Sequence, residues 1–68
     1  MKTFSETDYV LYNRENNLVA RFAFGREYVI FGSKEEAEED CRGHEQEVVK
    51  CTELPKHWQR ILLNQINK

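Results

Sequence analysis

The stretch from Phe31 to Asp40 constrains the fold of this chain more than any other. An apolar run ends at Phe31, Gly32 supplies a turn, and Ser33 is a residue type that caps helices. The Ser33 hydroxyl can accept a hydrogen bond from the backbone N–H of Glu36, and the Glu36 side chain can reach back to the Ser33 N–H. The stretch therefore predicts a strand-to-helix junction near the middle of the chain.

Length and composition indicate one small folded domain, residues 1–68. Apolar residues make up 40% of the chain and aromatic residues 12%, so the composition is not that of a disordered segment. A domain of this size buries only about 60% of the surface that its unfolded chain exposes. The small core makes a homodimer compatible with every function considered below.

Three strands are expected before the junction. Residues 8–12 and 28–31 are rich in β-branched and aromatic side chains, and residues 18–24 alternate between two faces. The asparagine-rich residues 13–17 predict a turn, because asparagine tolerates left-handed backbone and bonds to it locally. Short connections of this kind favour an antiparallel meander.

Two helices and a fourth strand are expected from the junction onward. The capped helix should cover residues 34–42, with an apolar stripe of Ala37 and Cys41, and Gly43 should end it in the left-handed conformation. Residues 47–52 predict the fourth strand. A last helix should begin at Pro55 and pack through one apolar face, formed by Trp58, Ile61, Leu62 and Ile66.

The expected fold is therefore α+β, in the order β-β-β-α-β-α. The fourth strand should return parallel to the first or to the third through a right-handed crossover. Because the first and third strands are apolar on both faces, both faces of the sheet should be covered. We expect the short helix on one face and the Trp58 helix on the other, or the Trp58 helix at the sheet edge.

Charge is divided unevenly along the chain. The net charge is −2, which gives no general attraction to nucleic acid. Residues 35–47 hold seven acids against Arg42, whereas residues 48–68 are mainly basic. The acidic helix can be a solvated face, or it can dock on a partner by imitating the phosphate charge of DNA or RNA. Its candidate partner-binding residues are Glu35, Glu36, Glu38, Glu39 and Asp40.

Aromatic side chains are the second candidate for partner binding. The chain has more of them than a core of this size can enclose, and an exposed apolar patch marks a binding site. We expect Tyr9, Tyr12 or Tyr28 to supply exposed anchors, although the same rings could instead fill both sheet faces.

The basic last helix supports a different function. Lys56, Arg60 and Lys68 could contact phosphates, which would make the chain a small nucleic-acid-binding protein. So few cations predict weak and salt-sensitive binding.

Two cysteines and two histidines form a C-x2-H…C-x5-H pattern. Cys41, His44, Cys51 and His57 could in principle hold zinc, but their spacing matches no established finger, and both cysteines have expected core positions. A Cys41–Cys51 disulfide and a Cys–His nucleophile are two further interpretations of the same residues. We expect no metal, no cofactor and no catalytic residue.

The N-terminus lacks the apolar region of a signal peptide, and no apolar run is long enough to span a bilayer. These observations predict a cytoplasmic protein without a membrane partner.

Residues 9–13, 28–37 and 48–50 together resemble small accessory proteins of bacteriophages and mobile elements, which often place a capped "F-x-S-x-E-E-A" helix between strands. The resemblance implies a non-enzymatic protein that binds a larger host protein or protein–nucleic-acid complex. Inhibitors of bacterial immunity, including anti-CRISPR proteins, have this size and acidity. The resemblance carries over no binding residue, and it leaves out the last helix.

Overall fold

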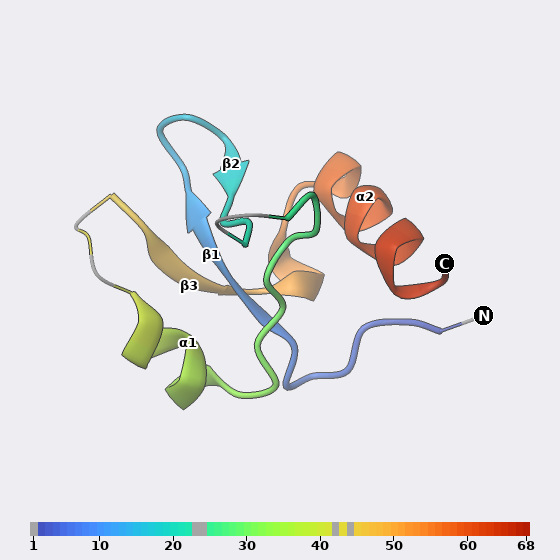
Figure 1. The fold of residues 1–68 in the computed structure, drawn as a ribbon, viewed down its shortest axis with the longest axis horizontal. Coiled ribbons are helices and arrows are strands. Elements are labelled where there is room, and N and C mark those ends of the chain that lie inside the picture. Colours follow the sequence, from blue (N-terminus) through green and yellow to red (C-terminus); the bar gives the residue numbers. More distant parts are fainter. Residues whose placement is uncertain (1, 23–24, 42, 44) are drawn as a thin grey trace.

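A computed structural model describes residues 2–22, 25–41, 43 and 45–68. Within them a three-stranded antiparallel sheet combines with two α-helices, which confirms the α+β class (Figure 1). The strands are β1 (Tyr9–Asn13), β2 (Leu18–Val19) and β3 (Glu47–Lys50). The helices are α1 (Lys34–Asp40), the 3₁₀ turn η1 (Cys51–Glu53) and α2 (Lys56–Ile66).

The order β-β-β-α-β-α is not confirmed. Residues 28–31 form no continuous strand and instead make two isolated antiparallel bridges, Arg21 with Tyr28 and Tyr9 with Phe31. The backbone of Tyr28 also bonds to a side chain of α2: its N–H donates to Gln65 Oε1 at 2.8 Å, and its carbonyl accepts from Gln65 Nε2 at 2.9 Å.

The second expected strand is also shorter than its sequence pattern. It covers only Leu18–Val19, and the chain continues through Arg21 to a tight turn that returns at Tyr28. The end of the expected strand, residues 23 and 24, lies outside the described residues.

The central strand is β1, and the sheet order is β2-β1-β3. Tyr12 pairs with Val19 on one side and with Glu47 on the other. The fourth expected strand is β3. Both β3 and the chain at Phe31 run antiparallel to β1, and they lie on opposite edges of it. The expected parallel pairing is therefore wrong. After α1 the chain reaches β1 at Tyr12, so β3 runs from Tyr12 towards Tyr9, against the direction of β1.

Each sheet face is contacted by one helix. Val10, Tyr12 and Val19 form one core cluster with Trp58 and Leu62 of α2. Leu11 points to the opposite face, because side chains alternate along a strand, and α1 contacts β1 and β3 there. We call these two surfaces the α2-side face and the α1-side face. Of the two arrangements expected from the sequence, the one with a helix on each face agrees with these contacts.

The helix boundaries differ slightly from those expected. Ser33 caps α1 by accepting a hydrogen bond from the Glu36 N–H at 3.2 Å, as the sequence indicated. The helix ends at Asp40, because Cys41 is already extended at φ −79° and ψ 105°. Gly43 does not adopt a left-handed conformation; among the described residues only Asn17 has positive φ, at 55°. Pro55 lies one residue before α2 rather than at its first position.

Candidate functional site

The α1-side face continues beyond α1 onto the segments that bond to the other edge of β1. Val48 lies opposite Leu11. Leu11 accepts from the Ala20 N–H at 2.9 Å, and Ala20 accepts from the Val29 N–H at 3.0 Å. Phe31 pairs directly with Tyr9, so residues 28–31 also lie beside β1.

The uncovered half of this face is apolar. Leu18 and Phe22 are 57% and 55% exposed, the two highest values among the large apolar residues described. Phe31 and Val29 are partly buried beside them. Alternation along residues 18–22 and 28–31 places all four side chains on the α1-side face, because Val19 and Ile30 point into the α2-side core.

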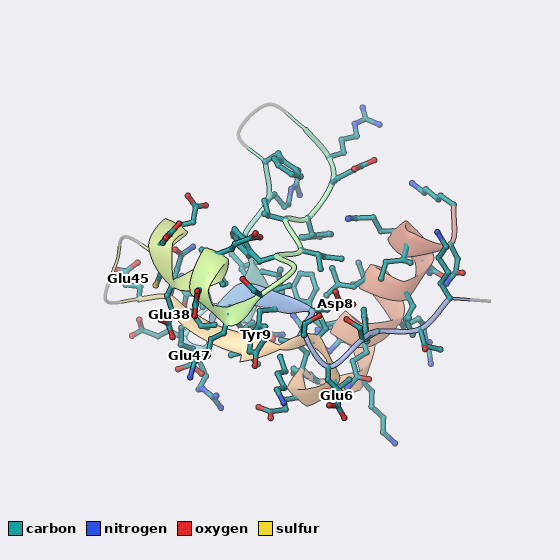
Figure 2. All side chains as sticks on the ribbon, turned by 90° about the horizontal axis from the view of Figure 1, so that it is seen from below. Glu6, Asp8, Tyr9, Glu38, Glu45 and Glu47 are labelled. Atoms are coloured by element: carbon teal, nitrogen blue, oxygen red, sulfur yellow. The ribbon has the colours of Figure 1, made fainter. Side chains whose placement is uncertain are left out.

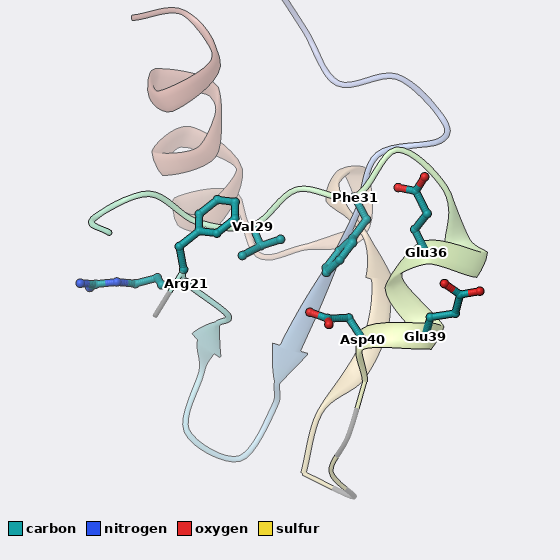
Figure 3. A pocket seen from close by; sticks show the side chains of 7 residues that line it. Arg21, Val29, Phe31, Glu36, Glu39 and Asp40 are labelled. Atoms are coloured by element: carbon teal, nitrogen blue, oxygen red, sulfur yellow. The ribbon is translucent and has the colours of Figure 1, made fainter. Parts of the chain in front are cut away.

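An open groove of about 610 Å³ lies between this apolar surface and α1 (Figure 3). Its apolar floor consists of Phe22, Val29 and Phe31, and Arg21 lies at its outer end. Three carboxylates of α1 form its opposite wall: Glu36, Glu39 and Asp40. We refer to these seven residues as the acidic groove. The Arg21 guanidinium lies over the Tyr28 ring, 5.7 Å from its centroid.

The groove carboxylates are solvated and lack a neighbouring cation within the described part of the chain. The ion pairs found there join Lys34 to Glu38 at 3.8 Å and Arg14 to Glu47. Neither pair involves the groove wall. The Glu36 carboxylate also makes no hydrogen bond to the Ser33 N–H among these residues, so the reciprocal half of the expected capping box is missing.

The structure therefore divides the expected acidic site. All five carboxylates of α1 are exposed, but only Glu36, Glu39 and Asp40 line the groove. Glu35 and Glu38 lie elsewhere on the helix. Figure 2 shows Glu38 on α1 and Glu47 on β3, with Glu6 and Asp8 in the segment before β1.

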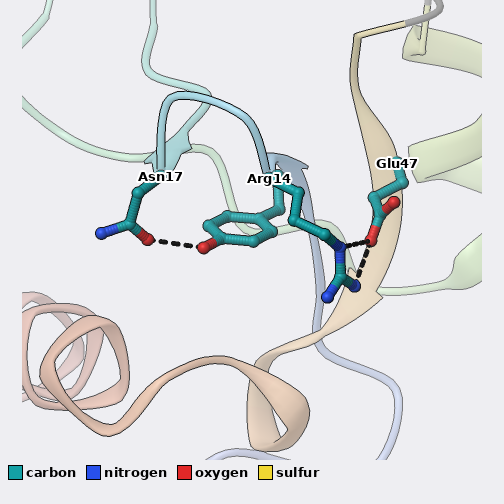
Figure 4. Close-up of polar contacts among 4 residues, drawn as sticks. Arg14, Asn17 and Glu47 are labelled. Carbon is teal, nitrogen blue, oxygen red and sulfur yellow. Dashed lines mark hydrogen bonds and ion pairs between the residues drawn. The ribbon is translucent and has the colours of Figure 1, made fainter.

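The expected aromatic anchors are mostly not exposed. Tyr12 is a core residue, 6% exposed, and its hydroxyl donates to Asn17 Oδ1 (Figure 4). Tyr28 packs edge-on against Trp58, with ring centroids 5.2 Å apart. Tyr9 is partly buried next to Phe31. The exposed aromatic ring among the described residues is instead Phe22, which the period-two pattern of residues 18–24 places on the same face as Leu18.

The cysteine and histidine residues do not form a recognisable chemical centre in the described residues. Cys51 is fully buried beside Val10 and Trp58, and burial raises the pKa of its thiol to about 12. Such a thiol stays protonated at neutral pH and is a poor nucleophile. Cys41 donates to the Gln46 carbonyl at 3.4 Å. Both cysteines are free, so the disulfide interpretation is wrong.

Within residues 2–22, 25–41, 43 and 45–68, no three His, Cys, Asp or Glu side chains are grouped closely enough to hold a metal ion. His44 lies outside the described residues. His57 is exposed and packs beside Trp58, with its Nε2 3.4 Å from Asn17 Nδ2.

The basic residues of the alternative site, Lys56, Arg60 and Lys68, are exposed in and after α2. They lie on the other side of the sheet from the acidic groove, together with Ile61, which is 38% exposed. Their role in nucleic-acid binding stays a prediction. No described helix combines the length and apolar character that crossing a bilayer would require.

Comparison of the chain with protein-family models, with curated proteins and with solved structures finds no match.

Proposed function

We propose that this chain is a non-enzymatic protein-binding module whose contact surface is the acidic groove. One observation carries the proposal: an exposed apolar floor lies directly beside three carboxylates that form no ion pair with any residue of the described part of the chain. Apolar contact supplies affinity at such a surface, and the charge selects and orients the partner. The complementary partner is a protein segment with large apolar side chains flanked by lysine or arginine.

This chemistry agrees with an inhibitor of a larger host protein, such as a defence nuclease complex. Proteins that hold nucleic acid present basic surfaces, and an acidic module that occupies one of them blocks it without making or breaking a bond. The resemblance to phage and mobile-element proteins implies the same kind of activity. On this proposal the source of the partner is the host, and its contact residues are basic and apolar.

The experiment is selection from a random peptide library displayed on phage, with the full chain as the bait. We expect the enriched peptides to combine basic residues with large apolar ones, because both parts of the groove must be satisfied. A library that yields no enriched peptide, or peptides without basic residues, would contradict the proposal.

Two double variants of α1 provide a matched control for charge. Glu36→Gln/Glu39→Gln and Glu35→Gln/Glu38→Gln each remove two negative charges from the same helix, but only the first pair lines the groove. The enriched peptides should bind the first variant about tenfold more weakly, a difference of about 1.4 kcal/mol, and should bind the second nearly as well as the wild type. Equal losses in both variants would show that only the overall charge matters, and the groove would then not be the contact surface.

A further inference from the structure

The acidic groove lies alongside α1 and combines an apolar floor with a charged wall. α1 contacts β1 and β3, and the floor is formed by Phe22, Val29 and Phe31 from the segments next to them. Among the described residues this floor stays open on the α1-side face, and Phe22 is 55% exposed. Figure 3 shows α1 on one side of this space, with Phe31 and Val29 facing it.

From this geometry we infer that the partner segment is an amphipathic basic α-helix that lies on Phe22, Val29 and Phe31 beside α1. The inference rests on the proposed function and states the conformation of the partner. Its apolar stripe would lie on the groove floor. Its basic side chains would face the Glu36, Glu39 and Asp40 carboxylates.

The backbone chemistry of the surface decides between a helix and an extended peptide. An extended peptide binds well at a sheet edge, where unpaired N–H and C=O groups continue the ladder. The groove floor is a sheet face, and the Ala20 carbonyl and the Val29 N–H already bond to each other there. An extended peptide would lose water from its own backbone groups without gaining partners, whereas a helix satisfies those groups internally.

The spacing of the carboxylates also suits a helix. Glu36, Glu39 and Asp40 are three and four residues apart, so they follow one side of α1 over about 6 Å at 1.5 Å per residue. Lysine or arginine at matching positions of a neighbouring helix reaches such carboxylates, as flanking charges do in coiled coils. The same three groups give a partner of opposite charge a defined position along α1.

A second copy of this chain fits the groove less well. Its basic helix is α2, but the apolar side of α2 is already buried through Trp58 and Leu62. The outward side of α2 offers only Ile61 as a large exposed apolar residue among those described. The groove therefore points to a separate partner helix.

The test uses two synthetic peptides of identical composition, each of about 16 residues of leucine, lysine and alanine. In the first, leucines recur every three or four residues; in the second, they alternate every two residues. Binding of labelled peptide to the full chain is measured by fluorescence anisotropy. We expect the helix-period peptide to bind at least tenfold more tightly and to gain helical circular dichroism on binding.

Two surface variants locate the contact. Phe22→Ala removes an exposed ring from the groove floor, and Ile61→Ala removes an exposed side chain of α2 as the control. The helix-period peptide should bind Phe22→Ala at least fivefold more weakly and Ile61→Ala unchanged. Equal binding to Phe22→Ala and wild type would overturn the inference.

The remaining outcomes separate this inference from the proposed function. If the strand-period peptide binds equally well or better, and Phe22→Ala weakens it, the partner is not a helix but the groove is still a protein-binding surface. If neither peptide binds and the displayed library is also not enriched, the proposed function fails with the inference.

Sedimentation of the chain alone is the last measurement. Self-association that Phe22→Ala abolishes would assign the groove to a second copy of the chain and would overturn the inference.

Discussion

At the scale of single residues, Asn17 joins the β1–β2 turn to α2. Its left-handed backbone, at φ 55°, is a conformation that asparagine tolerates better than most residues. Its Oδ1 accepts from the Tyr12 hydroxyl (Figure 4). The same oxygen accepts from Trp58 Nε1 at 3.1 Å, and Trp58 Nε1 also donates to the Asn17 carbonyl at 3.1 Å. One side chain thus satisfies polar groups of two core aromatic residues.

Substitutions at Asn17 should separate its backbone role from its side-chain role. Asn17→Gly keeps the left-handed turn but removes the acceptor of the Tyr12 hydroxyl, and we expect a loss of about 1–3 kcal/mol in the free energy of unfolding. Asn17→Asp keeps both the acceptor and the tolerance for this backbone, so it should lose less. Urea unfolding followed by tryptophan fluorescence measures both values, and a larger loss in Asn17→Asp would contradict the assignment.

Cys51 makes stability depend on alkaline pH. The thiol has a pKa of about 12 in the folded chain, because burial disfavours the thiolate, against an ordinary value of 9.0 when unfolded. The folded state therefore holds this proton more strongly. The contribution is fully present below about pH 9 and is lost as the pH rises from about 9 to about 12.

The matched measurement is urea unfolding of the wild type and Cys51→Ala at about pH 8 and about pH 10.5. The variant should be less stable at the lower pH, because it leaves a cavity, but it should lose less stability on the change of pH. Equal pH-dependent losses in both proteins would assign the effect to the lysines and tyrosines instead.

At the scale of elements, Gln65 substitutes for a missing strand partner. Its amide bonds to both the N–H and the carbonyl of Tyr28, as a neighbouring strand would. This contact fixes residues 28–31 against α2, and these residues carry Val29 and Phe31 into the floor of the acidic groove. The position of the groove floor therefore depends on a side chain from the opposite layer.

Gln65→Ala should loosen the residues around Tyr28, because two partly buried backbone groups lose their partners. We expect a loss of about 1–3 kcal/mol in stability and faster amide hydrogen exchange at Tyr28 and Val29 than in the wild type. The control is Asn64→Ala on the exposed side of α2, which should change neither quantity. Unchanged exchange at Tyr28 in Gln65→Ala would show that the amide contact does not hold this segment.

At the scale of the whole molecule, α2 joins parts of the chain that lie far apart in the sequence. Leu62 is fully buried in the cluster that includes Val10 of β1 and Val19 of β2. At the end of α2, Asn67 Oδ1 accepts from the Lys2 N–H at 2.8 Å, and Asn67 Nδ2 donates to the Lys2 carbonyl at 3.1 Å. The two ends of the chain consequently lie close together (Figure 1).

Leu62→Ala should therefore destabilise the whole domain. A buried leucine replaced by alanine costs about 2–5 kcal/mol, a large part of the total of about 5–15 kcal/mol that a domain has. Ile61→Ala, one residue earlier but 38% exposed, should cost less than about 1 kcal/mol. Thermal unfolding followed by circular dichroism checks both, and similar midpoints for the two variants would contradict the placement of α2.

The sequence by itself determined the features that depend on neighbouring residues. The Ser33 cap, the asparagine turn and the amphipathic pattern of α2 are local, so their residue types were sufficient to predict them. The coarse α+β class followed from the same patterns.

Only the tertiary structure decided which segments pair and which surface stays open. β3 pairs with β1 because α1 ends early and returns the chain to that edge, and Gln65 replaces a strand partner at Tyr28 from 37 residues away. The acidic groove exists because Phe31 pairs with Tyr9 of β1 and so places residues 28–31 beside α1. That pairing joins residues far apart in the sequence, which no local pattern of residues encodes.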